Sequence, residues 1–243
     1  AMRSDTLRQP DPRLLEGYLA CGGGHIRMVT LSPELEGALD IVQRLDEVGV
    51  VACMGHSEAD YAQAVAAIKK GVRHAVHTFN AMGPFHHRKP GVLGAVLTHE
   101  TVTAEVIPDG VHLHPAAVKL ILMAKGESRV VTVSDAHPLA GMRPGNYKDV
   151  NGRELMVGSD AVRLKDGTLA GGGTPMNRLV KNMAEFAGIA LQGAVASATI
   201  NPARLLGIEG KTGSLEAGKD ADITAVDDGF NVRLTMVKGE TVT

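Results

Sequence analysis

The sequence contains no tryptophan and few other aromatic residues. Three tyrosines and four phenylalanines among 243 residues bring the aromatic content to only 3%. Aromatic side chains are the surfaces on which nucleic-acid bases stack. With a formal net charge of −2, the sequence also lacks the excess of basic residues that is typical of nucleic-acid-binding domains. We therefore expect no nucleic-acid partner.

Cysteine and long apolar segments are equally scarce. The two cysteines, Cys21 and Cys53, are too few for a disulfide framework, which favours a reduced cytoplasmic location. No apolar run approaches the roughly 18 residues of a membrane span, and the charged start lacks a signal-peptide core. We expect no membrane partner. An apolar content of 44% is typical of a globular enzyme, and 243 residues suit one barrel domain, or one domain and a small appendage.

Two histidines organise the central part of the sequence. His56 and His77 each follow a short apolar run, and an amphipathic helix pattern over residues 62–71 separates them. This order predicts strand, helix and strand, with a histidine at the end of each strand. A single such histidine is more often structural than functional. Two of them at the shared face of a parallel α/β barrel can bind one metal ion, so we predict a metal site.

Two further strand ends also carry polar residues. His112 follows a β-rich segment over residues 101–107, and Asp135 ends the next one over residues 129–136. Polar residues that recur at the same structural position are difficult to explain by core packing alone. The four strand ends therefore predict a single functional site.

Two motifs resemble the N-acetylglucosamine-6-phosphate deacetylases of the amidohydrolase superfamily. They are Gly-His-Ser-x-Ala over residues 55–59 and His-x-Phe-Asn-Ala-Met over residues 77–82. The resemblance implies hydrolysis of the N-acetyl group of N-acetylglucosamine 6-phosphate to glucosamine 6-phosphate and acetate, in amino-sugar catabolism. It places a divalent ion, Zn²⁺ or another metal, on His56 and His77. It makes Asp135 the catalytic residue that takes a proton from water and donates one to the leaving amine.

The resemblance also implies a set of substrate contacts and a homodimer. In the family, part of the contact set can come from the partner subunit. The resemblance assigns the contact with the 6-phosphate to Arg88, which can bind a phosphate bidentately. After residue 171, Gly172-Gly173 departs from the serine-containing continuation that is usual in the family. The substrate-contacting positions are Asn80, Ala81, Arg88, His112, Leu169, Ala170 and Gly171.

The fold implied by the resemblance is a metal-dependent hydrolase barrel of the TIM type, truncated on its N-terminal side. Residues 1–150 would hold barrel strands four to eight with their helices. Residues 151–243 would hold the terminal barrel helices and part of a small β-sandwich. Helices are expected over residues 175–188 and 192–206, and a hairpin over residues 231–242 with its turn at 238–239. A further helix is expected to begin with Ser32 as its N-cap and Glu34 in its first turn.

The expected metal site lacks a third protein ligand, although a catalytic zinc site normally has three. Glu16 lacks the histidine and proline that flank the family's metal-binding glutamate, so we interpret it as a solvent-exposed helix residue. Glu34 and Glu105 are the next carboxylates to consider. Five strands cannot close a barrel, which leaves a fragment, a second chain or an oligomer as alternatives. Two functional alternatives also stay open: a catalytically impaired sugar-phosphate-binding fragment, and an amidohydrolase acting on a cyclic amide.

Overall fold

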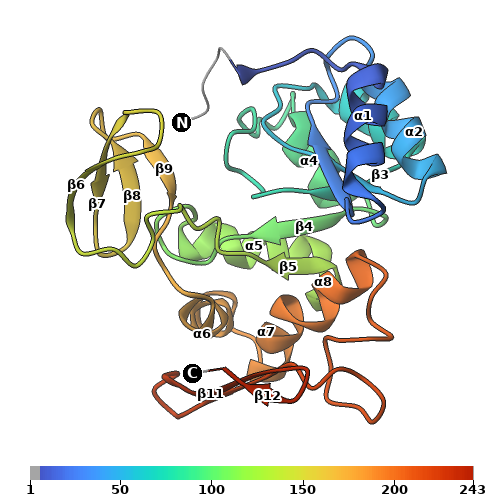
Figure 1. Cartoon of the computed structure of the whole chain (residues 1–243). Coiled ribbons are helices and arrows are strands. Elements are labelled where there is room, and N and C mark those ends of the chain that lie inside the picture. Colours follow the sequence, from blue (N-terminus) through green and yellow to red (C-terminus); the bar gives the residue numbers. More distant parts are fainter. Residues whose placement is uncertain (1–5, 243) are drawn as a thin grey trace.

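A five-stranded parallel sheet forms the centre of the computed structural model, which describes residues 6–242 (Figure 1). The strands lie in the sheet in the order in which they occur along the chain, and each pairs in parallel with the next. This arrangement is that of a barrel wall, in which all carboxyl ends of the strands share one face. The strands are β1 (Met28–Leu31), β2 (Val51–Met54), β3 (Val72–Ala75), β4 (Thr103–Val106) and β5 (Val130–Thr132).

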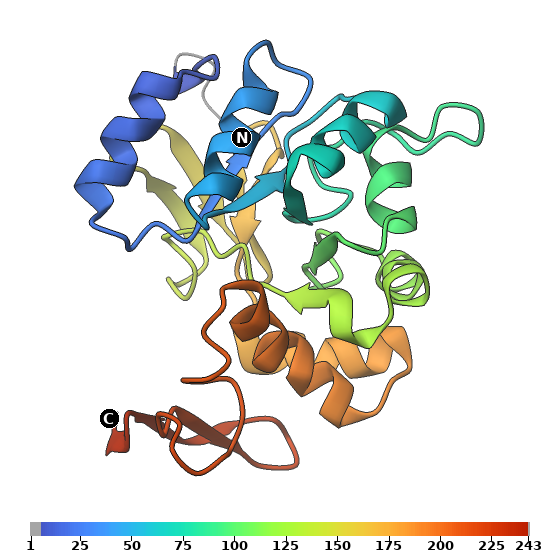
Figure 2. The same cartoon turned by 90° about the vertical axis from the view of Figure 1, so that its right-hand side faces the viewer.

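Helices connect these strands and cover one side of the sheet (Figure 2). Ala52 and Met54 of β2 and Ala104 of β4 face the helices and contribute to the main core. Because side chains alternate along a strand, Cys53, His74 and Glu105 face the opposite side, the interior of the barrel wall. The helices are α1 (Pro12–Gly22), α2 (Ala38–Glu47), α3 (Tyr61–Lys70), α4 (Gly91–Thr98) and α5 (Pro115–Lys125).

A second sheet of four antiparallel strands follows β5. It packs around its own small core of Leu155, Val157 and Val162. Its last strand meets the loop after β5 through a bridge between Ala136 and Gly172. The second sheet therefore borders the carboxyl end of β5. Its strands are β6 (Gly145–Lys148), β7 (Glu154–Val157), β8 (Ala161–Leu164) and β9 (Leu169–Gly172).

The C-terminal third returns to helices and then forms a small sheet. The helix expected over residues 175–188 is present as α6 (Met176–Ala187). The single helix expected over residues 192–206 is wrong, because the chain breaks at Thr199 into α7 (Leu191–Ala198) and α8 (Ile200–Leu205). Pro202 lacks the N–H that a continuous helix would need. A short 3₁₀ helix, η2 (Glu127–Arg129), precedes β5.

The expected hairpin at the C-terminal side is confirmed, with Lys238-Gly239 between its strands. It belongs to a three-stranded antiparallel sheet of β10 (Ile223–Val226), β11 (Val232–Val237) and β12 (Glu240–Thr241). In the described part of the chain, none of the helices has both the length and the hydrophobicity needed to cross a bilayer.

The segment between β1 and α2 differs from its prediction. Helix α2 begins at Ala38 with Gly37 as its N-cap, so Ser32 caps no helix and Glu34 is not in a first turn. The Ser32 hydroxyl instead donates to the carbonyl of His56 at 2.8 Å. The Glu34 carboxylate accepts from the Ser57 hydroxyl and from the Glu58 amide, each at 2.7 Å. Contacts across more than 20 residues have overridden the local capping signal, and they hold the loop that follows β2.

Candidate active site

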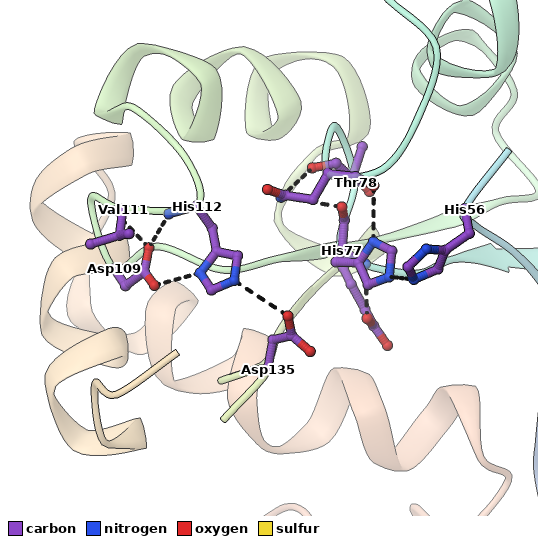
Figure 3. Close-up of polar contacts among 9 residues, drawn as sticks. His56, His77, Thr78, Asp109, Val111, His112 and Asp135 are labelled. Atoms are coloured by element: carbon purple, nitrogen blue, oxygen red, sulfur yellow. Dashed lines mark hydrogen bonds and ion pairs between the residues drawn. The ribbon is translucent and has the colours of Figure 1, made fainter. Parts of the chain in front are cut away.

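His56 and His77 lie just beyond the carboxyl ends of β2 and β3, and their rings meet. Their Nε2 atoms are 3.0 Å apart, and the two rings are perpendicular with centroids 4.6 Å apart (Figure 3). Both residues have left-handed backbone conformations, with φ of 50° and 31°. The structure therefore brings together the two histidines that the sequence predicts as metal ligands, with their Nε2 atoms facing each other.

The protonation of this pair suits metal binding. The Nδ1 of His77 lies 3.1 Å from the carbonyl oxygen of Asn80. A carbonyl only accepts, so Nδ1 carries the proton and Nε2 keeps its lone pair. Burial, and then the neighbouring His77, lower the pKa of His56, which favours its neutral form. Two ligands of a tetrahedral zinc ion with bonds near 2.05 Å would lie about 3.3 Å apart, close to the observed separation.

The described residues do not bring a third ligand to this pair. Among residues 6–242, no group of three or more His, Cys, Asp or Glu side chains could hold a metal ion. Glu16 pairs with Arg44 on the outer helices at 2.5 Å. Glu34 holds the loop after β2, and both carboxylate oxygens of Glu105 are engaged, by His74 and by the His77 amide. Of the carboxylates that the sequence offered, none joins the two histidines that are predicted as metal ligands.

Asp135 lies beyond β5 and is held by His112. Its Oδ2 lies 3.3 Å from the His112 Nε2, and its side chain is about half exposed. The hydrogen bond to His112 lowers the pKa of Asp135 despite partial burial, which keeps the carboxylate ionised. An ionised, accessible carboxylate near the histidine pair can act as a general base.

Asp109 supports His112 from the opposite side. Its Oδ2 lies 2.6 Å from the His112 Nδ1, and its Oδ1 accepts from the amides of Val111 and His112. Burial alone would lower the pKa of His112, but the bonds to Asp109 and Asp135 raise it to about 9. His112 is therefore a buried cation at neutral pH, held between two carboxylates (Figure 3).

A pocket of about 640 Å³ joins these groups. With one exception, every site residue expected from the sequence lines it. Four further lining residues were not expected: Thr6, His137, Arg153 and Thr168. They come from the N-terminal segment, the loop after β5 and the antiparallel sheet, where no motif marks them. The expected lining residues are His56, His77, Asn80, Ala81, His112, Asp135, Leu169, Ala170 and Gly171.

Strand β9 closes one side of the pocket and explains the glycine at position 172. The Gly172 amide donates to the Asp135 carbonyl at 2.7 Å, and its carbonyl accepts from the His137 amide at 3.1 Å. A Cβ on Gly172 would lie 2.5 Å from the carbonyl oxygen of Ser134. A serine at this position would require β9 and the loop that carries Asp135 to separate.

Arg88 is the exception among the expected substrate contacts. It lies in the segment between β3 and α4, is exposed, and does not line the pocket. Its Nη1 is 2.8 Å from the Nε2 of His87. The guanidinium that does line the pocket belongs to Arg153, whose Nε lies 2.6 Å from the Asp149 Oδ2.

Comparison with known proteins gives consistent results. Residues 16–242 match the model of the Amidohydrolase family. The chain is 37% identical over 239 residues to N-acetylglucosamine-6-phosphate deacetylase of Bacillus subtilis (strain 168), covering 98% of this chain and 60% of that protein. It is 38% identical over 226 residues to N-acetylgalactosamine-6-phosphate deacetylase of Escherichia coli O157:H7, covering 93% of this chain and 59% of that protein.

A solved structure extends the similarity to three dimensions. A variant of the Mycobacterium smegmatis N-acetyl-D-glucosamine-6-phosphate deacetylase, in complex with N-acetyl-D-glucosamine-6-phosphate, aligns with a TM-score of 0.93 and 36% identity. The alignment covers 98% of this chain and 63% of that one. The predicted barrel-type fold with an added sheet is thereby confirmed. The chain spans about 60% of the length of the curated relatives it matches.

Proposed function

Because this chain belongs to the amidohydrolase family, we propose that it carries the catalytic residues of a metal-dependent N-acetylglucosamine-6-phosphate deacetylase. The proposed reaction cleaves the N-acetyl amide and yields glucosamine 6-phosphate and acetate. The main support is the convergence of His56, His77 and Asp135 on one pocket. Relatives at 37% and 38% identity, which are named as amino-sugar phosphate deacetylases, support the substrate class.

His56 and His77 would hold the divalent ion, for which we propose Zn²⁺. When bound, such an ion activates water and polarises the amide carbonyl. Asp135 takes the proton of the attacking water and then donates a proton to the departing amine nitrogen. The contact with His112 holds the Oδ2 of Asp135, so the other carboxylate oxygen performs these transfers. His112 also keeps Asp135 ionised before the reaction begins.

The sugar would lie between the loop after β3 and strand β9. Asn80 and Ala81 line one side of the pocket, and Leu169, Ala170 and Gly171 line the other. A pocket of about 640 Å³ is within the size range of small-molecule sites. The polar backbone of β9 can bind sugar hydroxyl groups, because glycine lets a ligand approach the chain closely.

Two arginines are candidates for the 6-phosphate. Arg88 has the support of its motif, and Arg153 has the support of its position in the pocket. An exposed Arg88 outside the pocket of its own chain can reach the pocket of a second copy. We therefore propose a homodimer in which the segment around Arg88 extends toward the partner.

A cytoplasmic location completes the proposal. Cys21 and Cys53 are both free thiols in the structure, as in a reducing compartment. Burial raises the pKa of Cys53 to about 12, so this thiol is unreactive.

Acetate release tests the proposed reaction. The chain is co-expressed with the N-terminal segment that its curated relatives have and the alignment does not cover. Release is then measured with and without Zn²⁺ on N-acetylglucosamine 6-phosphate, its galactosamine epimer and the unphosphorylated sugar. We expect metal-dependent release from a phosphorylated sugar. Binding of the sugar phosphate without acetate release would support a catalytically impaired binding protein instead.

Three substitutions separate metal binding from proton transfer. In the co-expressed sample, His56→Ala and His77→Ala should each abolish stoichiometric metal, measured by elemental analysis. Asp135→Asn should retain metal but lower kcat by roughly 10²–10⁴-fold, the scale of lost acid–base catalysis. The exposed His25→Ala serves as the control and should change neither quantity. Undiminished metal in both histidine variants would contradict the ligand assignment.

Two arginine substitutions identify the phosphate contact. When the arginine that binds the phosphate is changed to alanine, the binding free energy of the phosphorylated sugar should weaken by roughly 2–3 kcal/mol, because a charge-assisted contact disappears. Binding of the unphosphorylated sugar should hardly change. Arg88→Ala and Arg153→Ala are compared by calorimetry. Equal losses for both ligands would assign the substituted arginine a structural role.

A further inference from the structure

A buried histidine–glutamate pair lies directly behind the histidine site. His74 on β3 is completely buried, and its Nε2 lies 3.0 Å from the Oε1 of Glu105 on β4. The other ring nitrogen, Nδ1, lies 2.6 Å from the hydroxyl of Thr103. An ionised carboxylate only accepts hydrogen bonds, so Nε2 of His74 is the donor. Both ring nitrogens of His74 are thus engaged, and His74 fixes the rotamer of Glu105.

The second oxygen of Glu105 holds the backbone of His77. Glu105 Oε2 accepts the His77 amide hydrogen at 3.0 Å, and the backbone carbonyl of Glu105 accepts from the Thr78 amide at 3.1 Å. The ladder between β3 and β4 pairs His74 with Thr103 and Ala75 with Ala104. Residues of β3 are held by backbone pairing with β4. For His77, which lies beyond the end of β3, the Glu105 side chain accepts the backbone hydrogen bond instead.

His77 needs such support because its backbone is strained. With φ of 31°, it occupies a left-handed conformation that is costly for a residue with a side chain. Strained conformations persist only where the surrounding structure holds them. This conformation places the His77 ring with its Nε2 facing the Nε2 of His56. Without the contact to Glu105, the His77 amide would lose its acceptor, and only the Asn80 carbonyl would hold the ring.

We propose that Glu105 and His74 are positioning residues for the metal ligand His77, an inference that rests on the proposed function. Glu105 holds the His77 backbone through Oε2, and His74 holds Glu105 through Oε1. Both oxygens are thus engaged, so Glu105 acts through His77 and is not a ligand. Residues that orient a metal ligand typically change metal affinity 10–100-fold when they are removed.

The test compares two substitutions of Glu105. Glu105→Ala removes the acceptor and should lower Zn²⁺ affinity about 10–100-fold. Glu105→Gln retains an oxygen that can accept the His77 amide, and its affinity should stay within about threefold of the unsubstituted chain. Affinity is measured on the 243-residue chain by titrating Zn²⁺ and following the imidazole signals of His56 and His77 by NMR, which also detects weak binding. Hydrogen exchange of the His77 amide in the metal-free chain should be fast in the alanine variant and protected in the glutamine variant.

Thr132→Val is the matched control. It removes a buried hydrogen bond between Thr132 and Ser197, of 2.7 Å, without touching either histidine. We expect lower stability but unchanged Zn²⁺ affinity.

If both Glu105 variants lose affinity equally, the loss of negative charge explains the effect and the positioning role is wrong. If Glu105→Ala binds Zn²⁺ like the unsubstituted chain, the positioning role is wrong, whereas the proposed function is unaffected. If the unsubstituted chain shows no response to Zn²⁺ either alone or co-expressed with the N-terminal segment, the proposed function fails with it.

Discussion

At the scale of single residues, backbone strain is concentrated at the site. His56, His77, Ala81 and Asp135 all have left-handed conformations, with φ of 50°, 31°, 49° and 44°. A non-glycine residue rarely adopts such a conformation, and each costs on the order of 1–3 kcal/mol. His56, His77 and Asp135 follow the ends of β2, β3 and β5 within three residues, and Ala81 lies further along the loop after β3. The strain is thus the cost of placing side chains over the carboxyl ends of the strands.

Gly171 offers a test of how closely β9 must approach Asp135. Its φ is 152°, and a Cβ there would lie 3.0 Å from the Asp135 carbonyl oxygen and from the His137 amide nitrogen. Gly171→Ala should therefore displace the loop that carries Asp135 and lower kcat by about 10-fold or more, since small misplacements at a reacting centre are costly. Gly167→Ala is the control, because Gly167 also has a positive φ but no atom near its missing Cβ. Equal activity of the two variants would contradict this prediction, which steady-state kinetics checks.

The buried Asp109–His112 pair predicts a pH-dependent contribution to stability. The pKa of His112 is raised from 6.5 to about 9, so its ion pair stabilises the fold fully below pH 6.5 and is lost as pH rises through about 9. Hydrogen bonds to His112 and to two amides lower the pKa of Asp109 despite its burial, so its contribution is lost only in acid. Asp109→Asn should thus cost roughly 2–3 kcal/mol near pH 5.5 and clearly less at pH 9.5.

Urea unfolding of the metal-free chain at both pH values measures the effect of Asp109→Asn. The exposed Asp228→Asn serves as the control and should change the free energy of unfolding little at either pH. A cost of Asp109→Asn that is independent of pH would show that the pair contributes by packing and not by charge.

At the scale of elements, α4 and α5 are joined by a buried cation. The ammonium group of Lys125, at the end of α5, donates to the carbonyl oxygens of Val96 and His99 at 2.8 and 2.5 Å. These carbonyls lie at the C-terminal end of α4, where helix carbonyls lack partners and a positive charge is favourable. Burial lowers the pKa of Lys125 to about 8. The contact therefore fixes the end of the helix that follows the Arg88 segment.

Replacing Lys125 with methionine tests this contact. Lys125→Met keeps the length of the side chain but leaves the buried Val96 carbonyl without a donor and the His99 carbonyl with only the Val102 amide, at 3.4 Å. We expect the free energy of unfolding to fall by about 1–3 kcal/mol, the scale of one unsatisfied buried polar group. Lys119→Met, on the exposed face of the same helix, should change it by less than about 0.5 kcal/mol. A neutral effect of Lys125→Met in urea unfolding would show that water satisfies these carbonyls.

At the scale of the whole molecule, the parallel sheet is open. Its five strands run from β1 to β5 without closing on themselves in the part of the chain that the structure describes. Five strands are too few for a barrel of the TIM type, which has eight. An open strand edge exposes unpaired backbone groups and favours association. The proposed metal site likewise has two protein ligands among residues 6–242, where a catalytic zinc site normally has three.

These features predict how the 243-residue chain behaves by itself. It should bind metal weakly, associate, and show little deacetylase activity. Co-expression with a polypeptide that carries three further strands and a His-Leu-Glu-Gly-Pro motif should restore metal occupancy and turnover. Size-exclusion chromatography with light scattering, elemental analysis and acetate release measure these properties on both samples. Full metal-dependent turnover by a monomeric chain alone would contradict this prediction.

The sequence by itself determined the elements and the residues at the strand ends. Hydrophobic periodicity predicted the main strands and helices, and the carboxyl ends of parallel strands share one face, so His56, His77, His112 and Asp135 could be placed together. Only the tertiary structure showed that Asp109 and Glu105 hold this set, that Arg153 lines the pocket and Arg88 does not, and that Ser32 caps no helix. Helix and strand signals are local, because they depend on neighbours a few residues away. The partners of Glu105 and Ser32 lie 24 to 31 residues away, and the fold alone decides which side chain meets them.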